Sequence, residues 1–409
     1  MKAVVFHGIG DIRLDDVPEP RIEQPGDAIV RMTASAICGT DLHMIRGTMT
    51  GMHAGTILGH EGVGIVEEMG RDVRNIREGD RVVAASTIAC GYCAYCRSGY
   101  FAQCDNSNPN GARAATAFFG GPRHTGPFNG LQAEKARVPF SNVGLVKLPE
   151  EVTDDQAILL SDIFPTGYFG ADLAEIKPGN TVAVFGCGPV GQFAIISAFL
   201  KGAGRVIAVD KIVSRLEMAR AHGAEAVNFE AEDPVEAILA LTGGIGVDRV
   251  IDAVGVDAEM PAKGPAAKIT EKQKEQFRRE LKQIAPEADL KRPSWRPGDA
   301  PSQALMWAVD SVAKAGTLSI IGVYPETVQS FPIGKAMNKN LTIQGGNCNH
   351  RKYIPMLIEL VKSGAVNPEE VLSNVTPFAS VLDAYRAFDE RQPGWMKVEL
   401  VPSEELVGA

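Results

Sequence analysis

The hydrophobic pattern changes its rhythm partway along the chain. From residue 1 to about residue 152, short apolar runs are broken by glycine and proline, as at 28–33, 64–68 and 81–84. Short apolar runs bounded by turn residues are typical of β-strands. The first part of the chain is therefore predicted to form an all-β, barrel-like domain.

After this region the pattern predicts strands that alternate with helices. The six expected strands are 181–185, 205–210, 226–229, 250–253, 317–321 and 341–344, and the first two helices are expected at about 190–201 and 214–222. Such alternation indicates a doubly wound parallel sheet, so the fold class is α/β. A helix near 353–362 follows, and we expect the tail to rejoin the first domain.

Residues 256–302 do not fit this rhythm and are interpreted as an insertion. The stretch is rich in proline and charge, but Ile269, Phe277, Leu281 and Ile284 are spaced to share one helical face. We expect one helix that rests on the outer side of the cofactor cleft or on a neighbouring subunit. A disordered linker is the alternative.

Bulk composition narrows the function class. A chain of 409 residues favours two domains, and 45% hydrophobic with 22% charged residues is ordinary for a globular protein. A formal net charge of −9 argues against general nucleic-acid binding. No apolar run is long enough to suggest a membrane span, and residues 1–6 resemble a strand more than a signal peptide. A cytoplasmic location is expected.

A glycine-rich turn after the first predicted strand of the sheet indicates a dinucleotide site. It consists of Gly186, Cys187, Gly188, Pro189, Val190 and Gly191. The glycines permit a tight turn, close backbone approach to a pyrophosphate and close helix packing. Asp210 ends the next strand, where a carboxylate binds a ribose diol and repels a 2′-phosphate, which favours NAD over NADP. Arg215 is expected on the adenosine side. The alternative is an ordinary turn beside a solvated aspartate.

Four cysteines crowd into one short segment. They are Cys90, Cys93, Cys96 and Cys104. Four thiolates at this spacing can close around one tetrahedral zinc and leave no open position, so we predict a structural zinc. Free thiols or two disulfides are the alternatives.

Other candidate ligands are scattered along the chain. Cys38 precedes Thr40 and His43, His60 lies in Gly59–Glu61, and Asp162 lies at the junction between the predicted domains. None of these residues is decisive by itself. A lone buried histidine is more often a satisfied core residue, and an aspartate at a junction is usually a cap or a solvated charge.

The motifs together resemble those of the zinc-containing medium-chain alcohol dehydrogenase family. Gly59, His60 and Glu61, followed by Gly64, Gly70 and Val73, match the zinc signature of that family, and the four cysteines match its structural zinc lobe. Asp162 stands where the common pattern has cysteine. This departure and the insertion are similar to the branch that includes glutathione-independent formaldehyde dehydrogenases.

The resemblance implies a specific domain organisation. Residues 1–163 would form a GroES-like catalytic domain with the zinc lobe, and residues 164–344 a Rossmann domain with the insertion at about 256–302. Residues 345–409 would return to the catalytic domain.

The resemblance also implies roles for individual residues. Cys38, His60 and Asp162 would hold a catalytic zinc with one position open for an alcohol, which then gives hydride to the nicotinamide. Thr40 and His43 would relay the proton to the surface. Glu61 would act next to the metal, as an outer partner of the ligands or a transient fifth ligand. Thr166 would touch the nicotinamide, and Lys397 would reach the pyrophosphate or be a plain surface lysine.

The sequence thus predicts an oxidoreductase that uses NAD and two zinc ions per chain. The expected substrate is a small alcohol or aldehyde, with formaldehyde oxidation or dismutation and polyol oxidation as alternatives. A non-enzymatic NAD-binding protein is disfavoured because Cys38, Thr40, His43, His60 and Asp162 are all present. We expect a homo-oligomer, a dimer or a tetramer, without nucleic-acid or membrane partners.

Overall fold

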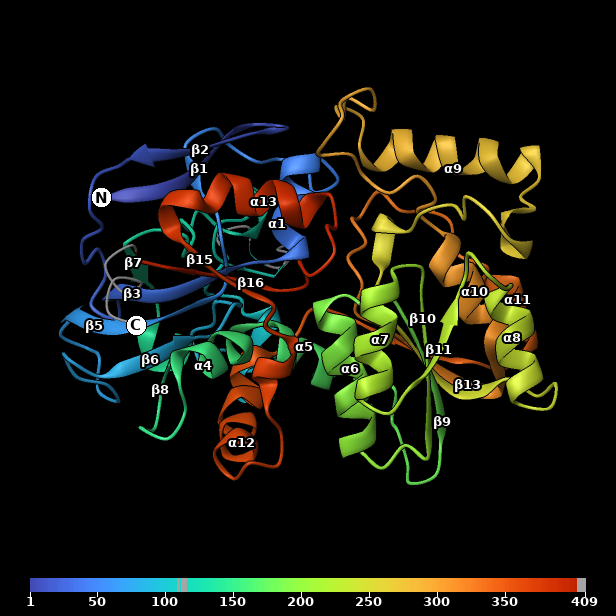
Figure 1. The fold of residues 1–409 in the computed structure, drawn as a ribbon. Helices are drawn as coiled ribbons and strands as arrows, with labels where there is room; N and C mark the ends of the chain where they lie inside the picture. The colour runs from blue at the N-terminus through green and yellow to red at the C-terminus, as the bar shows by residue number, and fades with distance from the viewer. Residues whose placement is uncertain (109–110, 112–115, 403–409) are drawn as a thin grey trace. The chain divides into compact units, whose positions relative to one another are not determined.

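A computed structural model describes residues 1–108, 111 and 116–402. The chain divides into two compact units (Figure 1). Unit 1 comprises Met1–Pro165, Lys291–Trp295 and Cys348–Ala409, and unit 2 comprises Thr166–Leu290 and Arg296–Asn347. Within the described ranges, no helix is long and apolar enough to cross a lipid bilayer.

Unit 1 contains two sheets in which most neighbouring strands are antiparallel. A three-stranded sheet has the order β2 (Asp11–Asp16), β1 (Lys2–Gly8) and β4 (Thr56–Ile57). The larger sheet has the order β15 (Asn374–Pro377), β16 (Val398–Val401), β3 (Ala28–Ile37), β5 (Gly62–Met69), β6 (Arg81–Ala84) and β8 (Leu145–Lys147), and β7 (Lys135–Val138) also pairs with β3. The sheet therefore brings the end of β3 beside the start of β5 and the start of β16.

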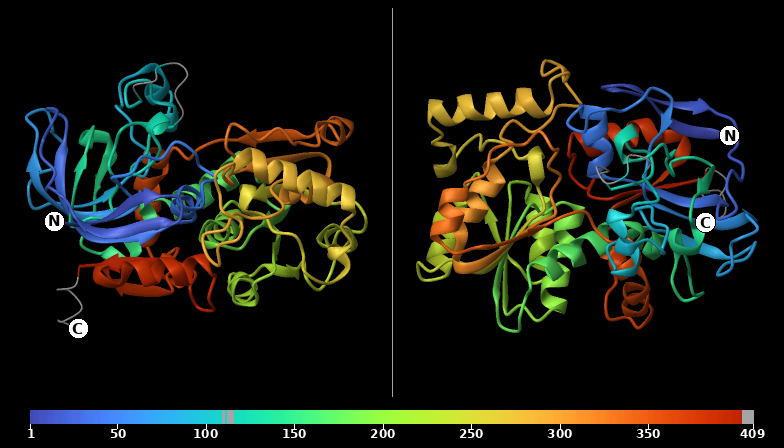
Figure 2. Two further views of the ribbon diagram at one scale, coloured as in Figure 1. Left: turned by 90° about the horizontal axis from the view of Figure 1, so that it is seen from above. Right: turned by 180° about the vertical axis from the view of Figure 1, so that it is seen from behind.

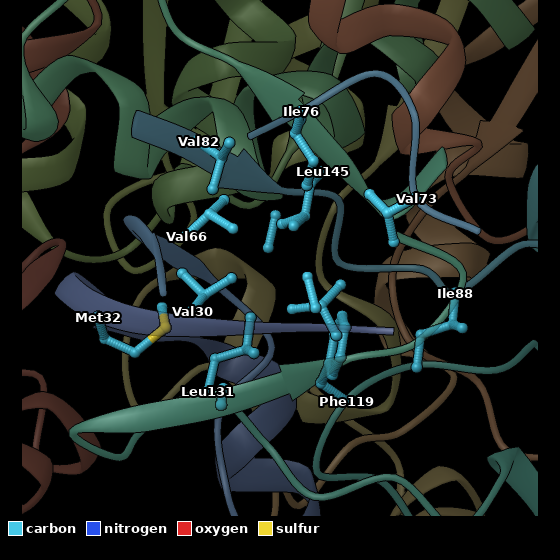
Figure 3. Packing of buried hydrophobic residues seen from close by; sticks show 14 of the residues in the cluster. Val30, Met32, Val66, Val73, Ile76, Val82, Ile88, Phe119, Leu131 and Leu145 are labelled. Atoms are coloured by element: carbon cyan, nitrogen blue, oxygen red, sulfur yellow. The ribbon is translucent and has the colours of Figure 1, made fainter. Parts of the chain in front are cut away.

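The core of this unit comes from alternate positions of the strands. Val30 and Met32 of β3, Val66 of β5 and Val82 of β6 point into one cluster with Leu131 (Figure 3). Because successive side chains of a strand point to opposite faces, alternate residues of each strand contribute to the same core.

Helices flank the sheet ends of unit 1. They are α1 (Gly39–Arg46), α2 (Ala94–Arg97), α3 (Ser141–Gly144), α4 (Asp154–Ser161), α12 (His350–Lys362) and α13 (Val381–Asp389). Helix α4 begins with a capping box in which Thr153 accepts from the Gln156 amide and Gln156 accepts from the Thr153 amide. It ends at Asp162, and α5 (Ile163–Leu173) begins at the next residue.

Unit 2 contains a parallel sheet of six strands. Their order is β11 (Glu225–Asn228), β10 (Arg205–Asp210), β9 (Thr181–Phe185), β12 (Val247–Asp252), β13 (Val312–Ile320) and β14 (Thr342–Gly345). This is the Rossmann order. The chain adds strands outward from β9 to β11 on one side and then from β12 to β14 on the other, so the switch point of the sheet lies between β9 and β12. The α/β fold class predicted from the sequence is confirmed.

Helices cover both faces of this sheet (Figure 1). Val182 and Val184 of β9 pack with α5, α6 (Pro189–Leu200) and α7 (Val213–Ala221), whereas Ala183 and Phe185 pack with α8 (Pro234–Leu241) and α10 (Gln303–Ser311). Helix α11 (Ile333–Asn338) precedes β14. Apolar residues on both faces explain why the strands are continuous hydrophobic runs.

The insertion contains the expected helix, α9 (Glu271–Ile284), which Figure 2 shows as the long gold helix. Phe277, Leu281 and Ile284 are buried, and Ile269 precedes the helix and is half-buried. Leu281 and Ile284 pack on Val256 and Tyr324, which follow the carboxyl ends of β12 and β13. The disordered-linker alternative is therefore wrong for residues 271–284, and this helix is supported by its own unit.

After α9 the chain contributes five residues to unit 1 and then returns to unit 2. Within unit 1, Arg292 donates to the Ile9 carbonyl at 2.6 Å and the Trp295 amide donates to Asp389 at 2.8 Å. The Trp295 ring lies edge-on to Tyr385. The insertion is thus a third place where the chain crosses between the units.

Candidate active site

The first metal-binding cluster is the four-cysteine segment of unit 1. The sulfur atoms of Cys90, Cys93, Cys96 and Cys104 all lie within 4.8 Å of one another. Cys90 Sγ accepts from the amides of Tyr92 and Cys93 at 3.4 and 3.3 Å, and Cys104 Sγ accepts from the Cys90 amide at 3.2 Å. Amide donors directed at sulfur favour the thiolate form, which is the form that binds metal.

Thiol protonation is uneven in this cluster. Burial tends to raise the pKa of Cys93, but amide donors from Cys96 and Asp105 outweigh it and lower the pKa to about 7. Burial and the neighbouring sulfurs raise the pKa of Cys96 well above its usual range. Four thiolates cannot share this space without a compensating charge, and a divalent cation supplies that charge. The residues fit a structural zinc.

The second cluster is assembled from three separate segments of unit 1. Cys38 follows β3, His60 and Glu61 precede β5, and Asp162 lies between α4 and α5. Pairing of Ser35 with Gly62 brings the first two segments together. The Ser161 hydroxyl, which donates to the Ala84 carbonyl and accepts from the Gly62 amide, fixes the third.

The donor atoms of this cluster converge on one point. One atom each from Cys38, His60, Glu61 and Asp162 lies within 4.8 Å of the others, and all four residues are buried. Asp162 Oδ2 is 3.6 Å from Cys38 Sγ and 3.3 Å from His60 Nε2. Among the described residues, neither ring nitrogen of His60 has a hydrogen-bond partner of acceptable geometry. An unsatisfied buried imidazole beside a thiol and a carboxylate fits a zinc ion.

Electrostatics in this cluster reflect burial and mutual interaction. Burial, with the nearby Glu61 carboxylate, raises the pKa of the Cys38 thiol. Burial opposes the charge of His60, but Asp41, Cys38 and Asp162 together raise its pKa well above the ordinary value. Burial likewise opposes ionisation of Asp162, yet the nearby rings of His350 and His60 hold its pKa well below the usual range. The thiol, the imidazole and the carboxylate therefore interact strongly with one another, as expected of side chains that share one cation.

Two residues that the sequence did not single out support these ligands. Asp41 Oδ2 accepts from the Cys38 amide at 3.0 Å, and its Oδ1 lies 3.2 Å from His60 Nδ1. His350, the first residue of α12, lies 2.5 Å from Asp162 Oδ1 through its Nε2. Outer partners of this kind orient metal ligands. Asp41 lies in the already suspected segment 38–43, whereas His350 carried no local signal in the sequence.

Glu61 and Lys397 form a buried ion pair. Both side chains are fully buried, and the Lys397 ammonium pairs with Glu61 Oε2 and donates to the Ile37 carbonyl at 3.1 Å. Burial raises the pKa of Glu61 to about 7, with Lys397 opposing that shift. The sequence offered Lys397 as a pyrophosphate contact or a surface lysine. The surface alternative is wrong, because the side chain is 0% exposed.

The predicted relay residues lie on α1. Thr40 is half-buried in the first turn, and His43 Nδ1 lies 2.7 Å from the Thr48 hydroxyl. His43 is 4% exposed. The expected surface position of this histidine is therefore wrong: the end of α1 packs into a core that includes Leu42, Met44 and Ile45.

The glycine-rich turn lies in unit 2 between β9 and α6. Gly186 has φ +87, and a Cβ at Gly191 would lie 1.8 Å from the Gly186 carbonyl oxygen, so neither position admits a side chain without strain. A Cβ at Gly188 would meet a single neighbour, the Arg215 guanidinium at 3.7 Å. The turn thus presents an open backbone surface at the amino end of α6, which begins with Pro189 and Val190.

Asp210 lies beside this turn at the end of β10. Its Oδ2 accepts from the Cys187 amide at 2.8 Å, and its Oδ1 accepts from the amides of Lys211 and Ile212 at 2.7 and 2.9 Å. The carboxylate is thereby held against the glycine-rich turn. Thr166 is half-buried on α5, at the start of unit 2.

Comparison with known proteins identifies the family of the chain. The alcohol dehydrogenase GroES-like domain family matches residues 24–150, and the zinc-binding dehydrogenase family matches residues 189–263. The chain is 39% identical to the zinc-type alcohol dehydrogenase-like protein AdhB of Bacillus subtilis, over 98% of this chain and 100% of that protein. It is also 39% identical to the glutathione-independent formaldehyde dehydrogenase of Pseudomonas aeruginosa, over 63% of this chain and 66% of that protein.

A solved structure supports the same conclusion. Alcohol dehydrogenase TADH from Thermus sp. ATN1 superposes with a TM-score of 0.80 at 33% identity, covering 98% of this chain and 100% of that one. With near-complete coverage by relatives above 30% identity, the resemblance predicted from the motifs is confirmed, and the chain belongs to the zinc-dependent alcohol dehydrogenase family.

Proposed function

We propose that this enzyme transfers hydride between a small alcohol, or an aldehyde hydrate, and NAD at the cluster of Cys38, His60 and Asp162. The observation that carries the proposal is the convergence of three unlike donor side chains, one of them an imidazole without a hydrogen-bond partner among the described residues. Three protein ligands leave one position for substrate, as in catalytic zinc sites.

The chain's own residues have distinct roles in this proposal. Cys38, His60 and Asp162 hold the zinc, which supplies Lewis acidity toward the substrate oxygen. Asp41 orients His60 and the Cys38 backbone. Glu61 stays paired with Lys397, and we assign Lys397 to this buried pair in preference to the pyrophosphate. The pair holds the Glu61 carboxylate and the Lys397 ammonium beside the ligands and away from solvent.

Proton movement is assigned to Thr40 and His43. The contact between His43 Nδ1 and Thr48 holds the ring on α1, and the hydroxyl of Thr40 lies one turn earlier on the same helix. Because His43 is buried, the proton must leave through a further group or a water before it reaches solvent.

NAD is assigned to the glycine-rich turn of unit 2, with Asp210 at the ribose, Arg215 on the adenosine side and Thr166 at the nicotinamide. Asp210→Asn keeps the shape and removes the charge. It should raise the KM for NAD by about tenfold and narrow the preference for NAD over NADP. Initial rates with both cofactors measure this, and wild-type preference for NADP would contradict the ribose assignment.

Formaldehyde oxidation or dismutation is the second candidate. It is favoured by the carboxylate ligand Asp162 and by the likeness to a protein named as a formaldehyde dehydrogenase. A panel of primary alcohols, polyols and aldehydes, followed by NADH absorbance at equal enzyme concentration, tests both candidates. Turnover of formaldehyde without added glutathione, at a kcat/KM well above that for ethanol, selects the second.

Oligomerisation and location complete the proposal. Strand β14 is an edge strand, and Ile333, Met337 and Ile343 nearby are 58, 71 and 39% exposed. An unpaired edge beside exposed apolar side chains supports a homo-oligomer, a dimer or a tetramer.

No cysteine in the described residues forms a disulfide, and metal-binding thiols persist in a reducing compartment, which supports the cytoplasm.

A further inference from the structure

An aspartate ligand presents a problem that a cysteine ligand does not. A thiolate offers one donor atom, whereas a carboxylate offers two oxygens and can bind a metal through both. If Asp162 used both oxygens, it would occupy the position that an open site needs for substrate. The structure of the cluster shows how the two oxygens are separated.

Asp162 directs one oxygen toward the cluster and the other away from it. Oδ2 lies 3.6 Å from Cys38 Sγ and 3.3 Å from His60 Nε2. Oδ1 lies 2.5 Å from His350 Nε2. A carboxylate oxygen accepts and does not donate, so His350 Nε2 is the donor of this bond.

His350 is itself held firmly. Its Nδ1 lies 3.1 Å from the hydroxyl of Thr87, and the ring is buried at the start of α12. Helix α12 packs against α4, the helix that ends at Asp162. The donor and the carboxylate are therefore fixed by two helices that contact each other.

We propose that His350 is a positioning residue that restricts Asp162 to a single donor oxygen. By engaging Oδ1, His350 leaves Oδ2 for the metal and keeps one position of the site open. This inference rests on the proposed catalytic zinc site, and it assigns to His350 a role that a cysteine in place of Asp162 would make unnecessary.

The test uses cobalt in the full-length protein. Zinc is kept in the four-cysteine site and Co²⁺ replaces only the catalytic zinc. The visible absorption of Co²⁺ is strong in four coordination and weak when a fifth ligand is added. His350→Asn retains an amide near the Nδ1 position, next to Thr87, but cannot reach Asp162. His350→Gln places an amide near the Nε2 position and can donate to Oδ1.

The two variants should therefore differ. We expect His350→Asn to lose the strong visible bands and to bind Co²⁺ about 10–100-fold more weakly. His350→Gln should recover most of the band intensity. Wild-type bands in His350→Asn, or equal loss in both variants, would overturn the proposal.

A second set of variants, made in Asp162→Cys, separates a positioning role of His350 from a role in folding. In Asp162→Cys the ligand has one donor atom, so adding His350→Asn should change the cobalt bands little compared with Asp162→Cys alone. A change as large as in the wild-type background would overturn the proposal. His7→Asn is the matched control, because His7 also contacts an aspartate, Asp15, at 2.6 Å, but on the β1–β2 pair.

The wild-type protein distinguishes failure of this inference from failure of the proposed function. If the wild-type protein binds cobalt and Asp162→Ala does not, the metal site stands, and the His350 variants test positioning alone. If Asp162→Ala binds cobalt with wild-type bands, the proposed site itself is wrong.

Discussion

The two candidate metal-binding clusters of unit 1 differ in where their ligands come from: one takes four cysteines from a single segment, and the other takes one cysteine with unlike ligands. The four-cysteine cluster takes all its ligands from one short segment, and its own backbone amides donate to the sulfurs. The Cys38 cluster takes unlike ligands from three segments. Two of them have a partner from a different part of the unit: Asp41 for His60, and His350 for Asp162.

The difference follows from whether the site must stay open. Four identical ligands fill a tetrahedral site, so local turns are sufficient to build it. An open site has fewer ligands, and nothing but the surrounding protein keeps a spare oxygen or ring nitrogen from adopting another arrangement. The comparison predicts that damage to the first cluster affects stability, and damage to the second affects chemistry.

Loss of a catalytic ligand should have the largest effect. Asp162→Ala should reduce kcat/KM by about 10³-fold or more, because an interaction of several kcal/mol with the reacting oxygen is lost. Metal analysis should show the content falling from two zinc ions per chain to one. Full metal content with normal turnover would show that Asp162 is no ligand.

Breaking the buried pair of Glu61 and Lys397 should cause the largest loss of folding stability. Lys397→Met leaves the Glu61 carboxylate buried without its partner and should lower the free energy of unfolding by about 3–5 kcal/mol. The double variant Lys397→Met with Glu61→Gln should recover most of that loss. Denaturant unfolding measures both.

The same variants separate the two positions considered for this lysine. A raised KM for NAD in Lys397→Met, with unchanged stability, would support the pyrophosphate contact predicted from the sequence and contradict the buried-pair assignment.

Damage to the four-cysteine cluster should affect stability more than chemistry. Cys96→Ser removes one buried ligand, so the protein should retain one zinc per chain and unfold roughly 5–10 °C lower than wild type. Turnover at low temperature should stay close to wild type. A loss of activity as large as that of Asp162→Ala would remove the distinction between the clusters.

The relay should give the smallest effect. His43→Ala should slow alcohol oxidation about tenfold at neutral pH, with partial recovery at high pH, where hydroxide replaces the lost proton acceptor. Steady-state rates from pH 6 to 10 measure this. Because His43 also contacts Thr48, Thr48→Val is the matched control for packing. A pH–rate profile parallel to that of wild type would show that His43 takes no part in the relay.

Local sequence was sufficient for several features. The spacing of Cys90, Cys93, Cys96 and Cys104 predicted a cluster that the structure assembles, and the glycine-rich turn falls between a strand and a helix as expected. The hydrophobic rhythm predicted the six-stranded sheet and the insertion helix. The four cysteines and the glycine-rich turn are each local in sequence, so spacing carries their geometry. The strands and the helix are instead signalled by their hydrophobic period, although their packing partners are distant in sequence.

Other features were decided by tertiary structure. The sequence contains His350, Lys397 and His43 with nothing nearby to indicate a partner. Pairing of Val398 with Ile37 places Lys397 beside Glu61, packing of α12 on α4 places His350 against Asp162, and the core around α1 buries His43. The sequence determined which ligands exist and the folds that carry them. The tertiary structure determined which oxygen of Asp162 faces Cys38 and His60 and which faces His350. Only strand register and helix packing bring these side chains within hydrogen-bonding distance of one another.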